Sequence, residues 1–391
     1  MTGVQVAGVG MTHFCKPGAS PPFTDMAREA IIAALEDAGL TMADVGHVIA
    51  GYMYGDTTSG QRAVYEVGIT GVPVVNVNNA CATGSTALYL ARRMIEAGAA
   101  DVALAVGFEQ MPRGAIDRSF PGWPDPWGPS LAATQAVEGP SDAPFACQLF
   151  GGAAREYMER TGCSLETLAE IQVKARRHAA ANEHAMFRAP LTVREILDSA
   201  PVVGPLTRLM CCPPTCGAAA AVLCSDDFMR RRGLSGVSIR AQALVSDSPD
   251  VFTAGSPMKL VGVDMARRAA DQVYEASGVD PRDIRVAELH DCFTINELLA
   301  YEAVRLAPEG GAEQFVRDGD NTHGGRCVTN PSGGLLSKGH PIGATGLAQC
   351  AELVWQLRGQ AGARQVPDAR LALQHNLGLA GACVVTLYER A

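Results

Sequence analysis

The sequence predicts an α/β protein that consists of two similar βαβ-type halves, each a mostly parallel sheet covered by helices. Two internal matches indicate this repeat. Residues 25–30 match residues 264–269, and residues 81–88 match residues 340–347, in the same order along the chain. Two collinear matches are improbable by chance, so we expect one folding unit that occurs twice with pseudo-twofold symmetry.

The first match predicts the opening elements of each half. Both copies place apolar residues at helical spacing and then a glycine, Gly39 or Gly278, which is typical of a helix that ends in a left-handed residue. A short turn and a strand follow, and the strand of the second copy is expected at 284–289. Each half therefore begins with an amphipathic helix that leads into a strand.

The second match predicts a later helix in each half. In the first half the largely apolar run 74–77 predicts a strand, and residues 86–97 predict the helix that follows it. Both helices lead through a polar turn to a further strand, expected at 102–106 in the first half and at 371–373 in the second.

The stretch between the halves is predicted to be a loop or cap domain over residues 112–205. Its first part is an irregular, loop-rich stretch marked by seven prolines and two tryptophans: Pro112, Pro121, Trp123, Pro124, Pro126, Trp127, Pro129, Pro140 and Pro144. Helical patterns follow near 151–161 and 164–183. Because long loops inside compact domains usually carry binding function, we expect this stretch to cap one half.

Three domains follow from this division. The N-terminal half comprises residues 1–111 and is completed by about 206–235, where residues 212–224 predict its closing strand. The C-terminal half comprises residues 236–391 and opens with a strand predicted over 237–245. A chain of 391 residues is long enough for two or three domains.

The composition narrows the classes of function and location. A formal charge of −9 without a basic tract argues against nucleic acid and anionic membrane as partners. No apolar stretch approaches the roughly 18 residues of a membrane span, and residues 1–10 lack the layout of a signal peptide. Twelve irregularly spaced cysteines favour a reducing compartment. We therefore expect a soluble protein in the cytoplasm, without membrane insertion.

Neither a nucleotide cofactor nor a metal is expected. The opening Gly8-Val9-Gly10 would fit a dinucleotide-binding fingerprint, but His13 occupies the position of its third glycine. Cys211, Cys212 and Cys216 form the tightest cysteine cluster, but they lack the CxxC spacing and the nearby histidine of a metal site. A buried strand with small residues explains this cluster better.

Cys81 is the strongest candidate for a nucleophile. It lies between the strand 74–77 and the helix 86–97, among small residues. A helix N-terminus presents unpaired N–H groups and a positive dipole end, which stabilise a thiolate and an oxyanion beside it. A free cysteine is more often simply buried, but the strand-to-helix turn favours chemistry here.

The repeat pairs Cys81 with His340. Because pseudo-twofold halves place equivalent positions face to face, we expect both residues to meet at helix N-termini across one site. An imidazole with a near-neutral pKa can take the thiol proton and return it later. The turn-rich residues 330–341 would hold His340 close to the site, although a histidine that caps a turn is the alternative.

Two further segments lie at the carboxyl ends of predicted strands, where open α/β sheets place their sites. His290 and Cys292 follow the strand 284–289 and precede a helix predicted over 294–306. They could supply an oxyanion donor and a proton carrier, although such residues are often structural. Residues 374–381 end another strand with glycines, which lets backbone amides approach a ligand.

Together these motifs resemble the thiolase superfamily, and most closely the branch related to the thiolase part of sterol carrier protein X. They span nearly the whole chain: Asn79-Ala80-Cys81-Ala82-Thr83-Gly84-Ser85, Gly107-Phe108-Glu109-Gln110-Met111, His290-Asp291-Cys292-Phe293, Gly339-His340-Pro341-Ile342-Gly343-Ala344-Thr345-Gly346 and Gln374-His375-Asn376-Leu377-Gly378. The resemblance implies a thiolase fold of five layers, αβαβα, and a homodimer or tetramer.

The resemblance also implies roles for the site residues. Cys81 would form an acyl-enzyme, and His340 would activate it. His290 would share an oxyanion hole with His340, and Cys292 would be the acid/base for the α-carbon of the acetyl group. Backbone N–H groups of Cys81 and Gly378 would form a second oxyanion hole.

Two sets of residues are candidates for contact with the substrate. Asn376 departs from the commoner pattern, in which a Cys-x-Gly motif provides the acid/base, and we count it as a candidate contact to substrate or coenzyme A (CoA). The notable basic group of the cap is the other candidate for CoA, with a solvated helix face as the alternative; it comprises Lys174, Arg176, Arg177 and His178, with Arg188 beyond.

The implied activity is that of an acetyl-CoA C-acyltransferase, a 3-ketoacyl-CoA thiolase of lipid metabolism, with CoA as co-substrate and no resident cofactor. A retro-aldol lyase for steroid side-chain CoA thioesters is one alternative, and it would not need Cys81. A non-catalytic lipid-transfer or scaffold protein is the other. A small acyl-CoA-associated partner protein is a further expectation, because some relatives work in such complexes.

Overall fold

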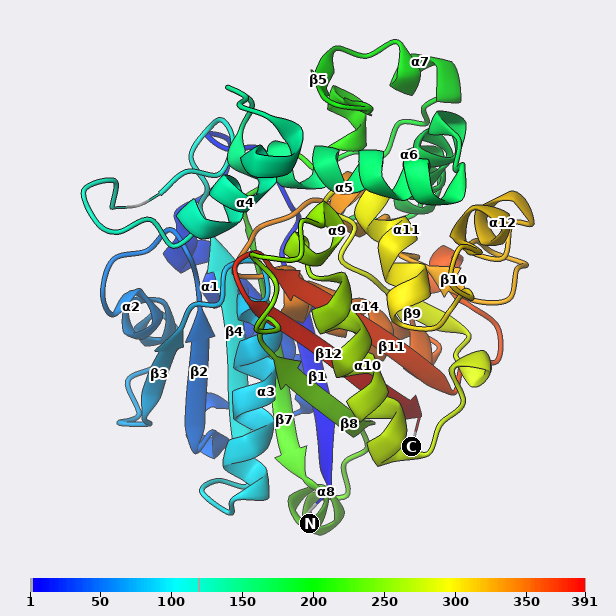
Figure 1. The fold of residues 1–391 in the computed structure, drawn as a ribbon. Helices are drawn as coiled ribbons and strands as arrows, with labels where there is room; N and C mark the ends of the chain where they lie inside the picture. The colour runs from blue at the N-terminus through cyan, green and yellow to red at the C-terminus, as the bar shows by residue number, and fades with distance from the viewer. Residues whose placement is uncertain (1–2, 119, 391) are drawn as a thin grey trace.

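Ten strands form one continuous sheet, to which each half of the chain contributes five (Figure 1). The computed structural model describes residues 3–118 and 120–390. The strand order is β3-β2-β4-β7-β1 in the N-terminal half and β10-β9-β11-β12-β8 in the C-terminal half. The strands are β1 (Val4–Met11), β2 (His47–Gly51), β3 (Val74–Val77), β4 (Val102–Glu109), β7 (Gly217–Ser225), β8 (Val237–Val245), β9 (Val286–Glu288), β10 (Val328–Thr329), β11 (Leu371–Gly378) and β12 (Ala382–Arg390).

The two strand orders correspond position by position, which confirms the predicted repeat and the α/β class. In the first half β2 runs parallel to β3 and β4, and β7 pairs antiparallel with β4 and β1. In the second half β9 runs parallel to β10 and β11, and β12 pairs antiparallel with β11 and β8. A short antiparallel contact between β1 and β8 joins the halves, where Gln5 lies opposite Ser238.

The two halves of the sheet and the helices around them form five layers. α3 (Thr83–Glu96) and α14 (Thr345–Arg358) pack against each other between the two halves of the sheet. α1 (Phe23–Ala38) and α2 (Ser59–Tyr65) cover the outer face of the first half, while α10 (Val263–Ser277) covers that of the second and packs on α11 (Thr294–Ala303). In the described ranges no helix combines the length and the apolarity that crossing a bilayer requires.

The segment between the halves is helical over much of its length and lies at the top of Figure 1. It contains α4 (Gly128–Glu138), α5 (Phe145–Thr161), α6 (Leu165–Ala179), α7 (Val193–Leu197) and β5 (Pro201–Val203), and β5 pairs with β6 (Leu206–Thr207) just beyond the segment. Apolar side chains of α5 and α6 share one core with those of α10 and α11, so the segment covers the C-terminal half. The described residues also form the short α-helices α8 (Asp226–Arg232), α9 (Pro257–Leu260), α12 (Ala312–Arg317) and α13 (Gly334–Ser337), and short 3-10 helices at Met42–Asp44, Arg208–Met210, Pro281–Asp283 and Gly362–Arg364.

The sequence expectation for the closing strand of the first half is wrong in detail. The closing strand expected over 212–224 begins only at Gly217, because Pro213 and Pro214 cannot donate to a strand ladder. The preceding residues instead form an extended segment that touches the site, with single bridges from Cys211 to Phe293 and from Pro214 to His340.

The alignment of the second match is also shifted. α3 begins two residues after Cys81, whereas α14 begins five residues after His340. The loop before α14 is therefore longer than its counterpart, and His340 reaches the site from a loop instead of from the first turn of a helix.

Candidate active site

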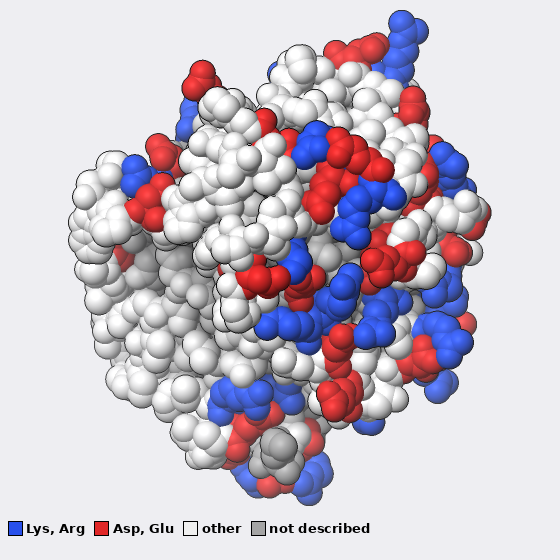
Figure 2. All heavy atoms as spheres, in the orientation of Figure 1, with Lys and Arg blue, Asp and Glu red and all other residues white. Residues whose placement is uncertain are grey.

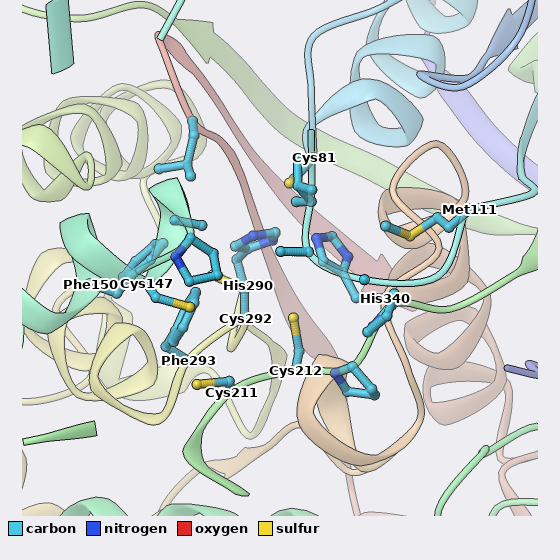
Figure 3. Close-up of a pocket in the computed structure, with 18 residues that line it drawn as sticks. Cys81, Met111, Cys147, Phe150, Cys211, Cys212, His290, Cys292, Phe293 and His340 are labelled. Carbon is cyan, nitrogen blue, oxygen red and sulfur yellow. The ribbon is translucent and has the colours of Figure 1, made fainter. Parts of the chain in front are cut away.

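An apolar cavity of about 100 Å³ lies where the loops before α3, after β9 and before α14 meet (Figure 3). Cys81, His290, Cys292 and His340 all line it. The structure thus brings together the four side chains that the sequence singled out, from both halves of the chain. The remaining wall is mostly apolar and includes Met111, Ile116, Ala146, Cys147, Phe150, Cys211, Cys212, Phe293 and Leu379.

The Cys81 thiol and the imidazoles of His290 and His340 converge on one point of the cavity. Cys81 Sγ and one ring nitrogen from each of His290 and His340 lie within 4.8 Å of one another. The two imidazole rings meet edge to face, with 5.1 Å between their centroids and 83° between their planes. A group bound to the thiol would therefore be within reach of both imidazoles.

The same three residues are of the type that binds zinc. A metal ion placed here would occupy the thiol and a nitrogen of each ring, which are the atoms that the acyl transfer expected from the sequence would use. Catalysis without a metal therefore stays a prediction for this cluster.

The surroundings of His340 determine which of its nitrogens can act as a base. Nδ1 lies 2.6 Å from Thr345 Oγ1, and that hydroxyl donates its own hydrogen to the Pro341 carbonyl oxygen at 2.9 Å. Thr345 Oγ1 must then accept, so the ring proton is on Nδ1. Nε2 is left unprotonated and has no partner among the described residues. The arrangement therefore leaves Nε2 as the acceptor for the Cys81 proton.

Burial dominates the ionisation of this site. It raises the pKa of Cys81 to about 12, and the Glu109 carboxylate adds to this rise. It lowers the pKa of His340 to about 3 and that of His290 well below its ordinary value. The expectation of a thiolate stabilised by a helix end, next to an imidazole of near-neutral pKa, is wrong for the resting site. Loss of water around the charged forms outweighs the helix end.

These pKa shifts still allow a proton to move from Cys81 to His340. When the proton of Cys81 moves to His340, the pair stays neutral overall, and the two opposite charges that form attract each other strongly in a dry cavity. Burial therefore opposes this transfer less than it opposes two separate ionisations. We expect a neutral thiol and a neutral imidazole at rest, and a thiolate only as it attacks.

Cys292 lies on the same cavity, directly after the motif residue Asp291. Burial raises its pKa well above the ordinary value, and the nearby Cys212 and Cys81 sulfurs add to the rise. The segment that carries Cys212 is fixed to this loop, because Cys212 N donates to the Cys292 carbonyl oxygen at 2.9 Å. Cys292 is therefore a protonated thiol at rest, suited to give a proton first.

The glycine at the end of β11 permits close contact with the Cys81 loop. A Cβ atom on Gly378 would lie 2.3 Å from the Asn79 carbonyl oxygen, so a side chain does not fit there. The main-chain N–H groups of Cys81 and Leu379 act on the thiol and lower its pKa against the effect of burial. The N–H beside the sulfur is thus that of Leu379, one residue after Gly378, and the role of Gly378 N–H stays a prediction.

The candidate CoA contacts on the cap lie outside this cavity. His178 is buried, with Nδ1 3.0 Å from the Asn330 carbonyl oxygen and Nε2 2.8 Å from Thr322 Oγ1. Arg176 is buried against the Phe187 ring. A phosphate could not reach either side chain without displacing these contacts, so both have structural contacts instead. Arg177 and Arg188 are exposed, and contact with CoA stays a prediction for them.

Asn376 is also placed differently from the sequence expectation. Its side chain is fully buried and makes hydrogen bonds to Ser85, His290 and the Cys81 main chain. All of its polar atoms are engaged by protein, which leaves none for a ligand. The expected direct contact of Asn376 with substrate or CoA is therefore wrong in this structure.

Glu109 is a site residue to which sequence reasoning gave no role, although its motif was part of the resemblance. The carboxylate is buried and accepts three main-chain N–H bonds, from Met53 at 3.1 Å, Tyr54 at 2.9 Å and Gly343 at 2.9 Å. It thereby ties the end of β4 to the loop that carries His340. Burial raises the pKa of Glu109 to about 7, and the three N–H groups oppose the rise.

We expect Glu109 to contribute a limb to the pH profile of activity. Above pH 7 the ionised carboxylate can accept all three N–H bonds, whereas below pH 7 the added proton faces N–H groups and loosens the His340 loop. Activity should thus fall as the pH drops through about 7. A Glu109→Gln protein should be roughly tenfold slower at pH 8 and should lack this limb. The buried Glu352, which is held by Arg364, supplies the control Glu352→Gln. An unchanged pH profile of activity in Glu109→Gln would contradict the assignment of this limb to Glu109.

Profiles of known protein families match most of the chain. The profile described as thiolase, N-terminal domain, matches residues 4–204, and the profile described as thiolase C-terminal domain-like matches residues 253–388. Sterol carrier protein 2 of Oryctolagus cuniculus is 51% identical over 391 residues, which cover 99% of this chain and 72% of that protein. A benzoylsuccinyl-CoA thiolase subunit of Thauera aromatica is 36% identical and covers 97% of this chain and 95% of its own.

A solved structure has the same fold over nearly the whole chain. It is described as an Ltp2-ChsH2(DUF35) aldolase and superposes with a TM-score of 0.84 at 26% identity. The superposition covers 99% of this chain and 98% of that one. Similarity thus extends to proteins named as a carrier, a thiolase subunit and an aldolase.

Proposed function

The chain belongs to the thiolase family, and we propose that it transfers acyl groups through a Cys81 acyl-enzyme. The reaction is the CoA-dependent cleavage of a 3-ketoacyl-CoA into a shortened acyl-CoA and acetyl-CoA or propionyl-CoA, or the reverse Claisen condensation. The observation that carries this proposal is the meeting of Cys81, His290 and His340 within 4.8 Å on an apolar cavity that Cys292 also lines. CoA acts as co-substrate, without a resident cofactor.

The first half-reaction begins with the Cys81 thiol. His340 Nε2 takes its proton while Sγ attacks the 3-keto carbonyl carbon, and main-chain N–H groups near Cys81 stabilise the oxyanion. The bond between carbons two and three then breaks, which leaves the acyl group on Cys81 and an acetyl-CoA enolate. His290 and the protonated His340 stabilise the negative enolate oxygen, and the Cys292 thiol gives its proton to carbon two.

The second half-reaction regenerates the site. The Cys292 thiolate takes the proton of an incoming CoA thiol, whose sulfur attacks the acyl group on Cys81. Cys81 leaves as a thiolate and recovers its proton from His340. Each proton has then returned to its original residue, so the site is ready for another cycle.

The apolar wall of the cavity suits the acyl chain of such a substrate. Burying each methylene stabilises binding by about 0.8 kcal/mol, and Phe150, Phe293 and Leu379 offer that surface next to the thiol. The cap helix α5 supplies part of this wall, which agrees with a binding role for the segment between the halves.

Product analysis separates this proposal from its alternatives. The purified protein should convert a 3-ketoacyl-CoA and CoA into acetyl-CoA and a chain-shortened acyl-CoA, as resolved by liquid chromatography. A retro-aldol lyase, which the aldolase named above makes a specific alternative, would instead release a ketone or aldehyde from a 3-hydroxyacyl-CoA. A lipid-transfer or scaffold protein would bind acyl-CoA and release neither set of products.

We extend the proposal to a homodimer or tetramer in the cytoplasm, with a small acyl-CoA-associated protein as partner. β3 lies at the edge of the sheet, where its backbone groups are unpaired on one side. Tyr65, Ile69 and Val75 are exposed apolar residues close to this edge in the sequence, and Figure 2 shows few charged side chains over α2 and β3, on its left side. These features suit the pairing of two copies.

Replacing Val75 by lysine should therefore shift the protein to the monomer, because a charged side chain on an edge strand opposes pairing. Size-exclusion chromatography with light scattering measures the mass. Phe252, an exposed apolar residue of the C-terminal half, supplies the control Phe252→Lys, which should leave the mass unchanged. An unaltered mass for Val75→Lys would place the contact elsewhere.

A further inference from the structure

We propose that Asn376 is a positioning residue, which holds His290 in the tautomer that carries its proton on Nε2 and so makes His290 a hydrogen-bond donor to the reacting oxygen. This inference rests on the proposed function, since it specifies how one histidine of that site performs its part. It gives a role to a residue that the reaction steps do not use.

The orientation of the Asn376 amide is fixed by its neighbours. Nδ2 lies 3.0 Å from the Cys81 carbonyl oxygen, which can only accept, so this atom is the NH₂ nitrogen. Oδ1 lies 2.8 Å from Ser85 Oγ, which donates to it. Rotating the amide by half a turn would place the carbonyl oxygen of Asn376 against that of Cys81.

A buried chain of hydrogen bonds supports the same orientation from the other side. Gln374 Nε2 donates to the Gly346 carbonyl oxygen at 2.6 Å and to Ser85 Oγ at 2.8 Å, and the Tyr388 hydroxyl donates to Gln374 Oε1. Because Ser85 Oγ already accepts from Gln374, its own hydrogen is free to point at Asn376 Oδ1. Ser85, Gln374, Asn376 and Tyr388 are all fully buried, so water does not compete for these bonds.

The fixed amide determines where the proton of His290 resides. Asn376 Nδ2 is 3.1 Å from His290 Nδ1, which must accept this hydrogen bond. Burial lowers the pKa of His290 well below its ordinary value, so the ring is neutral and has a single proton. That proton is then on Nε2, the other nitrogen of a ring that lines the cavity.

The two histidines of the site are thus held in opposite tautomers. Thr345 keeps the proton of His340 on Nδ1 and leaves Nε2 as a base, whereas Asn376 keeps the proton of His290 on Nε2. One ring can accept the thiol proton while the other donates to a developing negative oxygen. A site with both rings in the same tautomer could do only one of these at rest.

Nitrogen NMR of the intact protein tests the tautomer directly. Protonated and bare ring nitrogens resonate far apart, so ¹⁵N-labelled histidine reports which nitrogen of His290 carries hydrogen, with His290→Gln to assign its signals. We expect protonated Nε2 in the wild type at neutral pH. In Asn376→Asp a carboxylate faces Nδ1, and we expect the proton there. A wild-type His290 protonated on Nδ1 would overturn the inference whatever the variants do.

Kinetic measurements test whether the tautomer of His290 matters for the reaction. Loss of one oxyanion donor should lower kcat of Asn376→Asp by about 10²–10³-fold with KM changed less than about threefold. Asn182 is another buried amide, bonded to the Ser332 carbonyl oxygen, and Asn182→Asp measures the general effect of burying a carboxylate. Equal losses of kcat in both variants would reduce Asn376 to a structural residue. Since the NMR needs no substrate, a protein with the expected tautomer but no acyl transfer would contradict the proposed function alone.

Discussion

A Cys81→Ala protein should cleave 3-ketoacyl-CoA more slowly than the wild type by at least about 10⁴-fold. The proposed acyl intermediate is attached to Cys81, because among the described residues only the Cys81 sulfur is grouped with both His290 and His340. Neither histidine can substitute as nucleophile, since each is needed to move a proton or to stabilise an oxyanion. The loss should appear in kcat, measured with CoA and acetoacetyl-CoA at saturation.

The control for this variant is another buried cysteine. Cys224 lies on β7 and is fully buried outside the cavity, so Cys224→Ala loses a comparable volume without touching the site. It should keep its kcat within about threefold while losing some thermal stability. If Cys81→Ala retained more than about one hundredth of the wild-type rate, the acyl-enzyme route would be wrong and a lyase mechanism would gain support.

Replacing Cys292 by alanine should separate the two kinds of chemistry at this site. Cleavage of the carbon–carbon bond should slow by about 10²–10⁴-fold, because the enolate then lacks its proton donor. Exchange of labelled CoA into a simple acyl-CoA breaks no carbon–carbon bond, and Cys81 with His340 should still perform it, though slowed at the step that activates CoA. The ratio of the exchange rate to the cleavage rate should thus rise at least tenfold.

A second readout follows the proton itself. The wild type should exchange the α-hydrogens of acetyl-CoA with deuterium from solvent, and Cys292→Ala should not. Equal losses of exchange, cleavage and deuterium incorporation would show that Cys292 only maintains the cavity. Burial raises the pKa of Cys292 well above its ordinary value, so its protonated form should persist across the neutral pH range.

Much of the framework could be predicted from the repeat. Strands at 74–77 and 237–245 form with those bounds, and the internal matches correctly brought Cys81 and His340 to one place. The strand bounds follow from apolar runs, and the meeting of Cys81 and His340 follows from the internal matches. Both kinds of pattern are visible in the sequence. The length of the loop before α14 was not predictable in the same way, because helix patterns mark a boundary only to within a turn.

The electrostatic state of the site could not be predicted. A helix N-terminus suggests a thiolate, but the pKa of Cys81 depends on burial by residues from both halves and the cap, which no local pattern contains. The same applies to Glu109 and Asn376, whose roles depend on hydrogen bonds between residues far apart in the sequence. The prediction that His178 contacts CoA was wrong for a related reason. Spacing along a helix does not show that His178 is bonded to Asn330.

The most direct test of the acyl-enzyme is mass spectrometry of the intact protein and its peptides after brief mixing with 3-ketoacyl-CoA substrates of several chain lengths, without added CoA. The proposed reaction predicts a mass increase equal to the shortened acyl group, located on Cys81, absent from Cys81→Ala and removed on addition of CoA. An unmodified Cys81 with every substrate, or an adduct on another cysteine of the cavity, would contradict it.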